Sequence, residues 1–197
     1  MVSDIIIPKN NETEFAEIAS KLGYKKLYFL YDFDGYNEEK IQKKFEAIEN
    51  KKINIETGFL VNQKNLGKAA KKSRFLVVKS SEKDRFFIES KKIKLIYGFE
   101  ELYKKDYLHQ RASGLNHVLC ELARKNKVEV GFSYSSIINS KNNALLMGRI
   151  MQNLGLCRKY KVNIAVASFS SNPFDLRHHH DIASLFKLLG TDAKNNF

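Results

Sequence analysis

The sequence of 197 residues has no tryptophan, only two prolines and only two cysteines. Cys120 and Cys157 belong to no CxxC or Cys/His ligand pattern, so a disulfide framework is not indicated and a reducing cytoplasm fits. No apolar stretch approaches the length of a transmembrane helix, and the first residues, MVSDIIIPKN, lack the basic and long apolar segments of a secretion signal. We therefore expect a cytoplasmic protein with no membrane partner.

Several motifs that carry catalysis or nucleotide binding are also missing. The sequence contains no phosphate-binding P-loop, no GxGxxG and no GxSxG nucleophile elbow. It also lacks the RNP motif, the GXXG clamp and the zinc-finger spacing of common RNA-binding domains. Any binding of nucleic acid is therefore expected to depend on shape and charge.

Acidic residues are absent from two long segments of a basic chain. Lysine and arginine outnumber aspartate and glutamate by 34 to 22, and the formal net charge is +12. Residues 64–81 and 130–174 contain no carboxylate. Their basic residues include Lys64, Lys68, Lys71, Lys72, Arg74, Lys79, Lys141, Arg149, Arg158, Lys159 and Lys161. Charge that is segregated in this way favours contact with a phosphate backbone over a merely soluble, lysine-rich surface.

Short apolar runs alternate with amphipathic stretches along the whole chain. The expected strands are residues 4–7, 25–31, 53–61, 74–79, 93–97, 128–132 and 162–168. The expected helices are residues 11–22, 37–50, 81–90, 113–126, 142–160 and 178–189, with a short basic helix after residue 61. This alternation indicates parallel β/α units, and about seven strands is close to the eight of a TIM barrel. Without a Pro- or Gly-rich linker, we expect one α/β domain over residues 1–197, a TIM-like β/α barrel, with a doubly wound open sheet as the alternative.

Reacting groups of a β/α barrel lie where its strands end. Asp32 and Asp34, in the sequence YDFDG, follow the second expected strand and could bind a divalent metal, but this pattern is more typical of a capped turn. Other strand ends offer Lys79 and serines, and no His and carboxylate ligands that would converge there. We therefore predict no catalytic residue and no bound metal.

Three consecutive histidines, His178, His179 and His180, suggest a metal site at first sight. Successive helix positions point about 100° apart, so we expect that the three rings cannot converge on one ion. Cys120 lies among leucines on its expected helix. We interpret it as a small buried side chain and not as a nucleophile.

The segment HQRASGLNHVLCELARKNKVEVGFSYSSIINS, residues 109–140, resembles archaeal ribonuclease P protein component 3, the counterpart of the thirty-kilodalton eukaryotic subunit. The shared features are a basic residue at Arg111, the helix motif Leu-Asn-His-Val-Leu at 115–119 and the basic-to-Gly-Phe stretch 124–132. Downstream, NIAVASFSSNPFDLRHHHDIASLFKLLG is similar to the terminal strand, loop and final helix of the family, although relatives usually carry Ser/Pro-type residues in place of the three histidines. The resemblance covers roughly residues 73–190.

This resemblance implies a TIM-like barrel and membership of a ribonucleoprotein whose large RNA does the chemistry and holds Mg²⁺, so the chain itself needs no cofactor. The implied partners are the ribonuclease P RNA, ribonuclease P protein component 2 and other protein subunits, with precursor tRNA as substrate of the assembled enzyme. The implied function is support of the RNA-catalysed, endonucleolytic removal of the 5′ leader from precursor tRNA. From the family motifs and the basic segments together, the expected RNA-binding residues are Lys68, Lys71, Lys72, Arg74, Arg111, His117, Arg158 and Arg177.

Structural roles and other functions compete with these assignments. His117 could bond to Glu121 one helical turn later, Arg111 could pair with Asp106, and Arg177 could cap a helix. An independent metal-dependent phosphoesterase or nuclease on the same barrel would need ligands at the strand ends that the sequence does not offer. A generic RNA-binding module shares the charge pattern but not the motif. The stoichiometry, the face that meets a partner subunit and the role of the three histidines stay open.

Overall fold

The computed structural model describes residues 2–46, 48 and 53–190, and its strands form one parallel sheet in chain order. The strands are β1 (Ser3–Ile6), β2 (Lys26–Asp32), β3 (Asn54–Leu60), β4 (Leu76–Lys79), β5 (Leu95–Tyr97), β6 (Glu129–Ser133) and β7 (Ile164–Ala167). Each strand lies within one or two residues of the run of apolar residues that predicts it.

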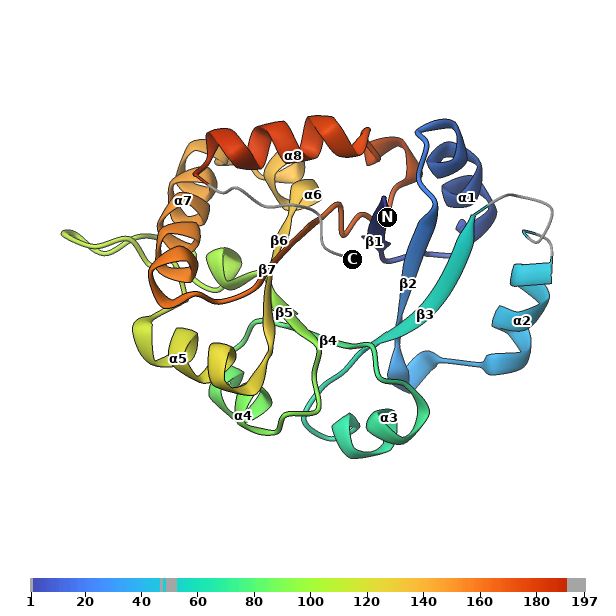
Figure 1. Ribbon diagram of the computed structural model, residues 1–197, viewed down its shortest axis with the longest axis horizontal. Helices are drawn as coiled ribbons and strands as arrows, with labels where there is room; N and C mark the ends of the chain where they lie inside the picture. Colours follow the sequence, from blue (N-terminus) through green and yellow to red (C-terminus); the bar gives the residue numbers. More distant parts are fainter. Residues whose placement is uncertain (1, 47, 49–52, 191–197) are drawn as a thin grey trace.

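Helices follow the strands and cover the outside of the sheet (Figure 1). They are α1 (Glu12–Lys21), α2 (Glu38–Glu46), α3 (Leu66–Lys72), α4 (Asp84–Glu89), α5 (His117–Asn126), α6 (Tyr134–Asn139), α7 (Asn143–Tyr160) and α8 (His179–Leu188). Short 3₁₀ turns are η1 (Phe33–Gly35), η2 (Phe99–Glu101) and η3 (Pro173–Asp175). The end of the helix predicted for residues 37–50 lies outside the described residues.

The chain beyond β7 returns to β1 and joins the two edges of the sheet. A parallel bridge links Ile6 to Ser170, and the Phe169 N–H donates to the Ile5 carbonyl at 2.8 Å. The Asp4 carboxylate accepts the N–H groups of Ile5 at 2.8 Å and Ser168 at 2.7 Å. Seven parallel strands in sequential order, with the last returning to the first, form a nearly closed TIM-like barrel, and the doubly wound alternative is wrong.

Alternation of side chains along the strands separates the interior of the barrel from its helical coat. The interior is filled by large side chains such as Tyr28, Leu95, Tyr97 and Phe169, and the rings of Tyr97 and Phe169 stack with centroids 4.4 Å apart. The opposite faces of the strands pack against the helices. The sheet therefore has buried positions on both faces, which explains why its strands read as apolar runs.

Two local differences from the predicted elements have clear physical causes. α5 begins at His117 and not near residue 113, because the Asn116 side chain caps it by accepting the Leu119 N–H at 3.0 Å. Just before it, Gly114 has φ +78, and a Cβ there would lie 2.2 Å from the Phe99 carbonyl oxygen.

The helix α6 was not predicted, because its serine-rich start is typical of a loop. In the structure, the Ser133 hydroxyl caps this helix by accepting the Ser136 N–H.

No helix among residues 2–46 and 53–190 is long and apolar enough to cross a membrane.

Candidate nucleic-acid interface

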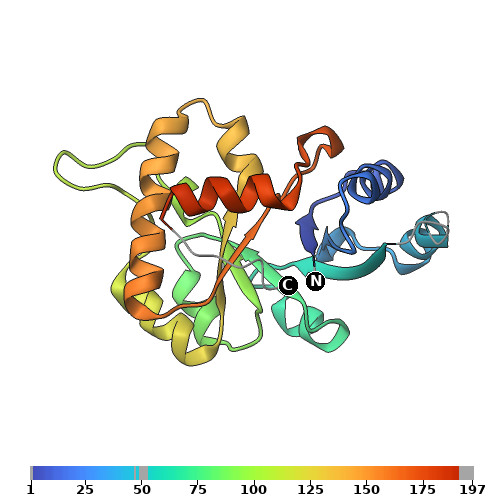
Figure 2. The same cartoon turned by 45° about the horizontal axis from the view of Figure 1, so that its top comes forward.

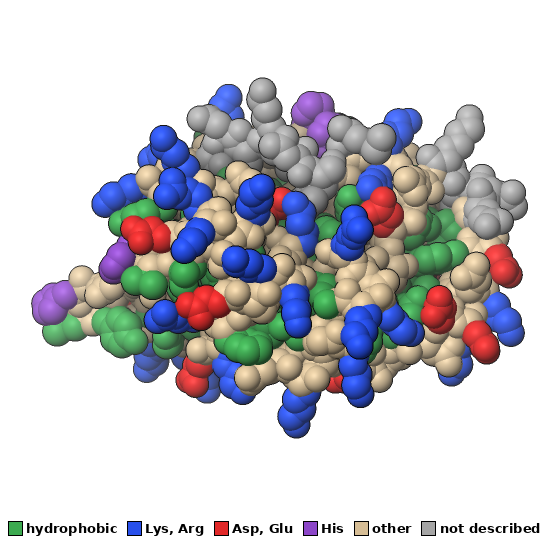
Figure 3. All heavy atoms as spheres, turned by 60° about the horizontal axis from the view of Figure 1, so that its bottom comes forward, with side chains coloured by type: hydrophobic (Ala, Val, Ile, Leu, Met, Phe, Trp, Pro, Cys, Tyr) green, Lys and Arg blue, Asp and Glu red, His purple; other side chains and the backbone are tan. Residues whose placement is uncertain are grey.

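The first group of predicted RNA-binding residues lies on and just after α3, on the outside of the barrel. Leu66 and Ala69 are buried against the core, so the lysines between them and after them point to solvent. Lys68, Lys71 and Arg74 are exposed, and they form no ion pair with any described residue. Lys72 is partly neutralised by Glu38 at 3.7 Å. Figure 3 shows this side of the molecule, with more basic than acidic side chains across it.

A second pair of predicted residues lies at the entry to α5. Arg111 is exposed, and its guanidinium donates to the Gly148 carbonyl on α7 at 3.1 Å, so it attaches its own segment to the barrel. Asp106 accepts from Arg149 at 2.7 Å, and among the described residues no hydrogen bond or salt bridge joins it to Arg111, although the charge of Arg111 also contributes to lowering the pKa of Asp106. His117 opens α5 and is exposed, and the described residues show no bond between it and Glu121.

The remaining two predicted residues, Arg158 and Arg177, lie at opposite ends of α8. Arg158 is near the end of α7 and reaches the carbonyl of Gly190, just past α8, at 3.5 Å. Arg177 precedes α8 and donates to the carbonyls of Phe174 and Leu176, both at 2.8 Å. Both side chains are exposed, and each also holds local backbone in place.

These groups do not form one compact patch. α3 lies on the opposite side of the barrel from α8, and the segment that carries Arg111 extends from the side near α5 and α7 (Figures 1 and 2). A small ligand could not contact all of them, whereas a large folded RNA has the dimensions to follow the outside of the barrel.

Two basic residues counted in the acid-free segments are not free surface charges. Arg149 is 1% exposed; its Nε donates to Asp106 at 2.7 Å, and its Nη1 donates to the carbonyls of Glu100 at 2.9 Å and Tyr103 at 2.6 Å. Lys79 pairs with Glu101 at 2.7 Å. These two positions therefore do not contribute to a purely basic surface, because acids from residues 100–106 fold back onto them.

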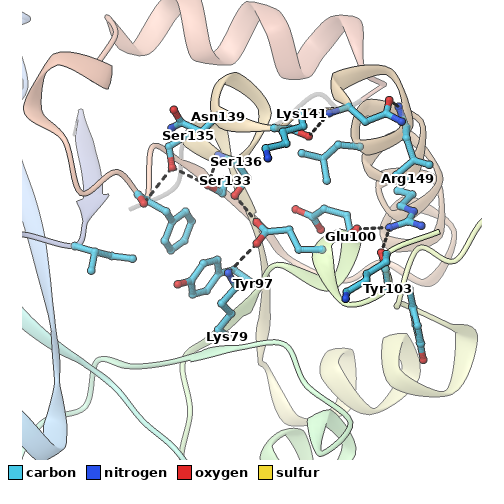
Figure 4. A pocket seen from close by; sticks show the side chains of 18 residues that line it. Lys79, Tyr97, Glu100, Tyr103, Ser133, Ser135, Ser136, Asn139, Lys141 and Arg149 are labelled. Atoms are coloured by element: carbon cyan, nitrogen blue, oxygen red, sulfur yellow. Dashed lines mark hydrogen bonds and ion pairs between the residues drawn. The ribbon is translucent and has the colours of Figure 1, made fainter. Parts of the chain in front are cut away.

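The carboxyl ends of β4 to β7 surround a cavity of about 550 Å³ (Figure 4). Glu101 accepts hydrogen bonds from Lys79 and from the Ser136 hydroxyl. The hydroxyls of Ser133 and Ser135 lie 3.2 Å apart beside them. Lysine, carboxylate and hydroxyl groups therefore meet at the mouth of the barrel. This is the part of the fold where β/α-barrel enzymes have their active sites.

Glu100 also lines this cavity but is fully buried, and burial raises the pKa of its carboxyl to about 7. Glu100 and Glu101 were missed as strand-end residues, although they follow the fifth predicted strand. Their position only a few residues after that strand could have identified them in the sequence. Gly98, at φ +82, turns the chain, and η2 then places both carboxylates beneath the mouth of the barrel. The described residues that line the cavity include no histidine.

The three histidines lie closer together than the sequence argument allows. His178 is the N-cap of α8, with φ −59 and ψ 140, so it lies outside the helix and its ring folds back; its Nδ1 accepts the His180 N–H at 3.3 Å. One ligand atom from each ring lies within 4.8 Å of the others. The prediction that the three rings cannot converge was wrong, because it assumed that all three residues are helical, whereas His178 lies outside α8.

Other sequence interpretations are confirmed. The YDFDG segment is a capped turn: the Asp32 carboxylate accepts the Asp34 N–H at 3.2 Å at the start of η1. Cys120 and Cys157 are buried free thiols in the packing between α5 and α7.

The sequence of this chain is similar to a protein-family profile and to curated proteins of archaea. A profile of the family described as RNase P subunit p30 matches residues 103–195. Ribonuclease P protein component 3 of Methanococcus maripaludis strain S2 is 24% identical over 181 residues, which cover 87% of this chain and 75% of that protein. The protein of the same name from Methanothermobacter thermautotrophicus is 26% identical over 188 residues, covering 89% and 74%.

A solved structure shares the fold. A chain in the cryo-EM structure of archaeal ribonuclease P with mature tRNA matches with a TM-score of 0.78, covering 95% of this chain and 82% of that chain at 16% identity. The resemblance carried by residues 109–140 is confirmed by the profile and by these curated relatives, and the chain is similar to ribonuclease P protein component 3 over most of its length.

Proposed function

We propose that this chain is a protein subunit of ribonuclease P that binds the RNA of that enzyme and supports RNA-catalysed removal of the 5′ leader from precursor tRNA. The observation that carries the proposal is the match to ribonuclease P protein component 3 over nearly the whole barrel. The separate basic surfaces at α3, at the entry to α5 and at the two ends of α8 suit an RNA that surrounds the protein.

In this proposal the chain is not the catalyst. The lysine at the mouth, Lys79, is bound to Glu101, and Glu101 also accepts from Ser136, so neither is free to act as a general base. The RNA would hold the Mg²⁺ that the reaction needs. The purified chain should therefore leave precursor tRNA intact, while its addition to the ribonuclease P RNA with the other protein subunits should raise cleavage.

The proposal also includes no stoichiometric metal on the histidines. Two imidazole nitrogens on one zinc ion, at Zn–N of about 2.0–2.1 Å, lie roughly 3.3 Å apart. His178 Nδ1 is already a helix cap, and the ligand atoms of the three rings spread up to 4.8 Å. Elemental analysis of the dialysed protein should find no zinc or manganese. One ion per chain, lost when His179 is replaced by Ala, would contradict this part of the proposal.

The proposed partners are the ribonuclease P RNA, ribonuclease P protein component 2 and the other protein subunits, in the cytoplasm. The test is affinity purification of the tagged chain, followed by sequencing of the bound RNA and size-exclusion chromatography with component 2. Recovery of the ribonuclease P RNA and co-migration with component 2 support the proposal. Recovery of unrelated RNA alone, or cleavage by the isolated chain that survives removal of contaminating nuclease, would overturn it.

A further inference from the structure

The segment between η2 and α5, residues 102–116, extends beyond the body of the barrel (Figures 1 and 2). Its tip carries two large side chains with little protein around them: Tyr107 is 62% exposed and Leu108 is 92% exposed. Scattered apolar side chains on a surface need no explanation. Two neighbours at the end of a projection are different, because no further folding of the described chain can cover them.

The projection is held firmly at its base. Asp106 accepts from Arg149 at 2.7 Å and from the Ala112 N–H at 2.9 Å, which joins its two arms. Arg111 binds the Gly148 carbonyl, and the absence of a Cβ at Gly148 leaves room for the guanidinium, which would lie 3.0 Å from such an atom. The tip is closed by the Tyr107 N–H, which donates to the Gln110 carbonyl at 2.9 Å. The exposed side chains are therefore presented in a fixed place, which lowers the entropy lost on binding.

The charge of the projection identifies the kind of partner. The exposed side chains of Lys104, Lys105 and Arg111 are basic, and His109 lies at the tip beside Leu108. The acid of the projection, Asp106, lies at its base and is bound to buried Arg149; although burial opposes it, hydrogen bonds from Ala112 and Arg149 lower its pKa and keep it ionised in that pair. Aromatic side chains among cations are typical of surfaces that bind single-stranded RNA, where bases stack on rings and phosphates meet the charges.

We infer that the projection 102–116 binds unpaired nucleotides of RNA, with Tyr107 stacking on a base, Leu108 packing beside it, and Lys104 and Lys105 meeting the flanking phosphates. The ring of Tyr103 contacts that of Tyr107, with centroids 6.3 Å apart and planes tilted by 53°. The inference rests on the proposed function, since it assigns a single-stranded region of the bound RNA to this loop.

The absence of tryptophan from the chain provides a direct test. Tyr107→Trp places the only indole of the protein at the tip, where stacking on a base should quench its fluorescence. The probe is a short, unstructured RNA oligonucleotide, and the same sequence in a duplex is the comparison. Phe86→Trp, at an exposed position on α4, a helix that carries none of the proposed RNA-binding residues, is the matched control. We expect saturable quenching of the Tyr107→Trp protein by the single strand, weaker quenching by the duplex, and none in the control.

A second measurement separates stacking from charge. Tyr107→Ala should weaken binding of the ribonuclease P RNA on the order of tenfold at every salt concentration, because stacking on an aromatic ring involves no counterions. The slope of log affinity against log salt should stay unchanged, and Tyr107→Phe should bind as wild type. Phe86→Ala, on α4, is the control for loss of an exposed aromatic side chain, and circular dichroism verifies that each variant is folded.

The outcomes distinguish this inference from the proposed function. If wild type fails to bind the ribonuclease P RNA, the proposed function fails. If wild type binds and Tyr107→Ala binds equally well, with no quenching of the Tyr107→Trp protein, the inference is overturned. It is also overturned if Tyr107→Ala and Leu108→Ala keep RNA affinity but lose co-migration with a partner protein, since the tip is then a protein contact.

Discussion

The α3 segment and the projection 102–116 are both basic, but they hold their charges in opposite ways. At α3, Lys68 and Lys71 extend freely into solvent from a short helix whose other face is buried. In the projection, buried Arg149 supports a loop whose own cations and apolar tip are displayed. Basic residues of an acid-free segment can therefore be exposed side chains that are free to meet phosphates, as on α3, or a buried arginine that holds a neighbouring loop in place, as Arg149 does.

The largest expected effect comes from removing that anchor. Arg149→Ala removes the donor to the carbonyls of Glu100 and Tyr103, and it leaves Asp106 with the Ala112 N–H but without its cationic partner. Breaking such a buried network costs about 3–5 kcal/mol of unfolding free energy. Urea denaturation measures the loss. Lys159→Ala, on the same helix but exposed, is the matched control and should cost less than about 0.5 kcal/mol. Equal stability of the two variants would show that Arg149 is not an anchor.

Asp4 gives a smaller effect, which depends on pH. Burial raises the pKa of this carboxyl to about 6 in the folded protein, above the usual 3.9 or so of an unfolded chain. Between these values the folded state binds a proton that the unfolded state does not, so this group makes the protein less stable as pH rises towards 6 and beyond.

Asp4→Asn removes that titration and keeps an oxygen to accept the N–H groups of Ile5 and Ser168. Relative to wild type, the variant should therefore gain about 1–3 kcal/mol of unfolding free energy between pH 4 and pH 7. Thermal or urea unfolding of both proteins across this pH range measures the difference. A difference that is constant with pH would contradict the proton-linked role of Asp4.

The smallest expected effect compares one residue from each region. Arg111→Ala should weaken binding of the ribonuclease P RNA more than Lys68→Ala does, by on the order of 1 kcal/mol, because arginine can grip a phosphate with two hydrogen bonds. In addition, Arg111 fixes the projection to Gly148. Arg111→Lys should recover only part of the affinity. Gel-shift titration is the measurement. Equal affinities of the two alanine variants would contradict the two-hydrogen-bond grip, and wild-type affinity of Arg111→Ala would place Arg111 outside the interface.

The fold was predictable because its signal is local. Each apolar run became a strand, and α1 and α8 begin and end within one residue of the bounds expected from the sequence. Burial of Arg149 could not be read in the same way, since it depends on carbonyls and a carboxylate more than 40 residues earlier in the chain. Pairing across such distances is set by the topology and not by neighbouring residues.

The candidate interface was predictable in kind but not in arrangement. The charge pattern and the motif identified exposed cations at α3, Arg111 and Arg177, and the structure places all of them on the surface. The pattern did not reveal that the segments carrying these cations lie on different sides of the barrel (Figure 1). It also did not reveal that Tyr107 and Leu108 are exposed in the projection. The sequence alone does not show whether an apolar residue is exposed or buried, so only the tertiary structure distinguishes the two cases.

The central claim, that the outer basic surfaces bind the ribonuclease P RNA, is tested most directly by the salt dependence of that binding. Wild type is compared with the triple variant Lys68→Ala, Lys71→Ala and Arg74→Ala. The logarithmic slope should be steep for wild type and shallower by roughly 2–3 for the variant, because each lost phosphate contact removes about 0.7–0.9. Both proteins should be equally stable, since exposed charges contribute little to folding. A slope near zero for wild type, or equal slopes for the two proteins, would contradict the account.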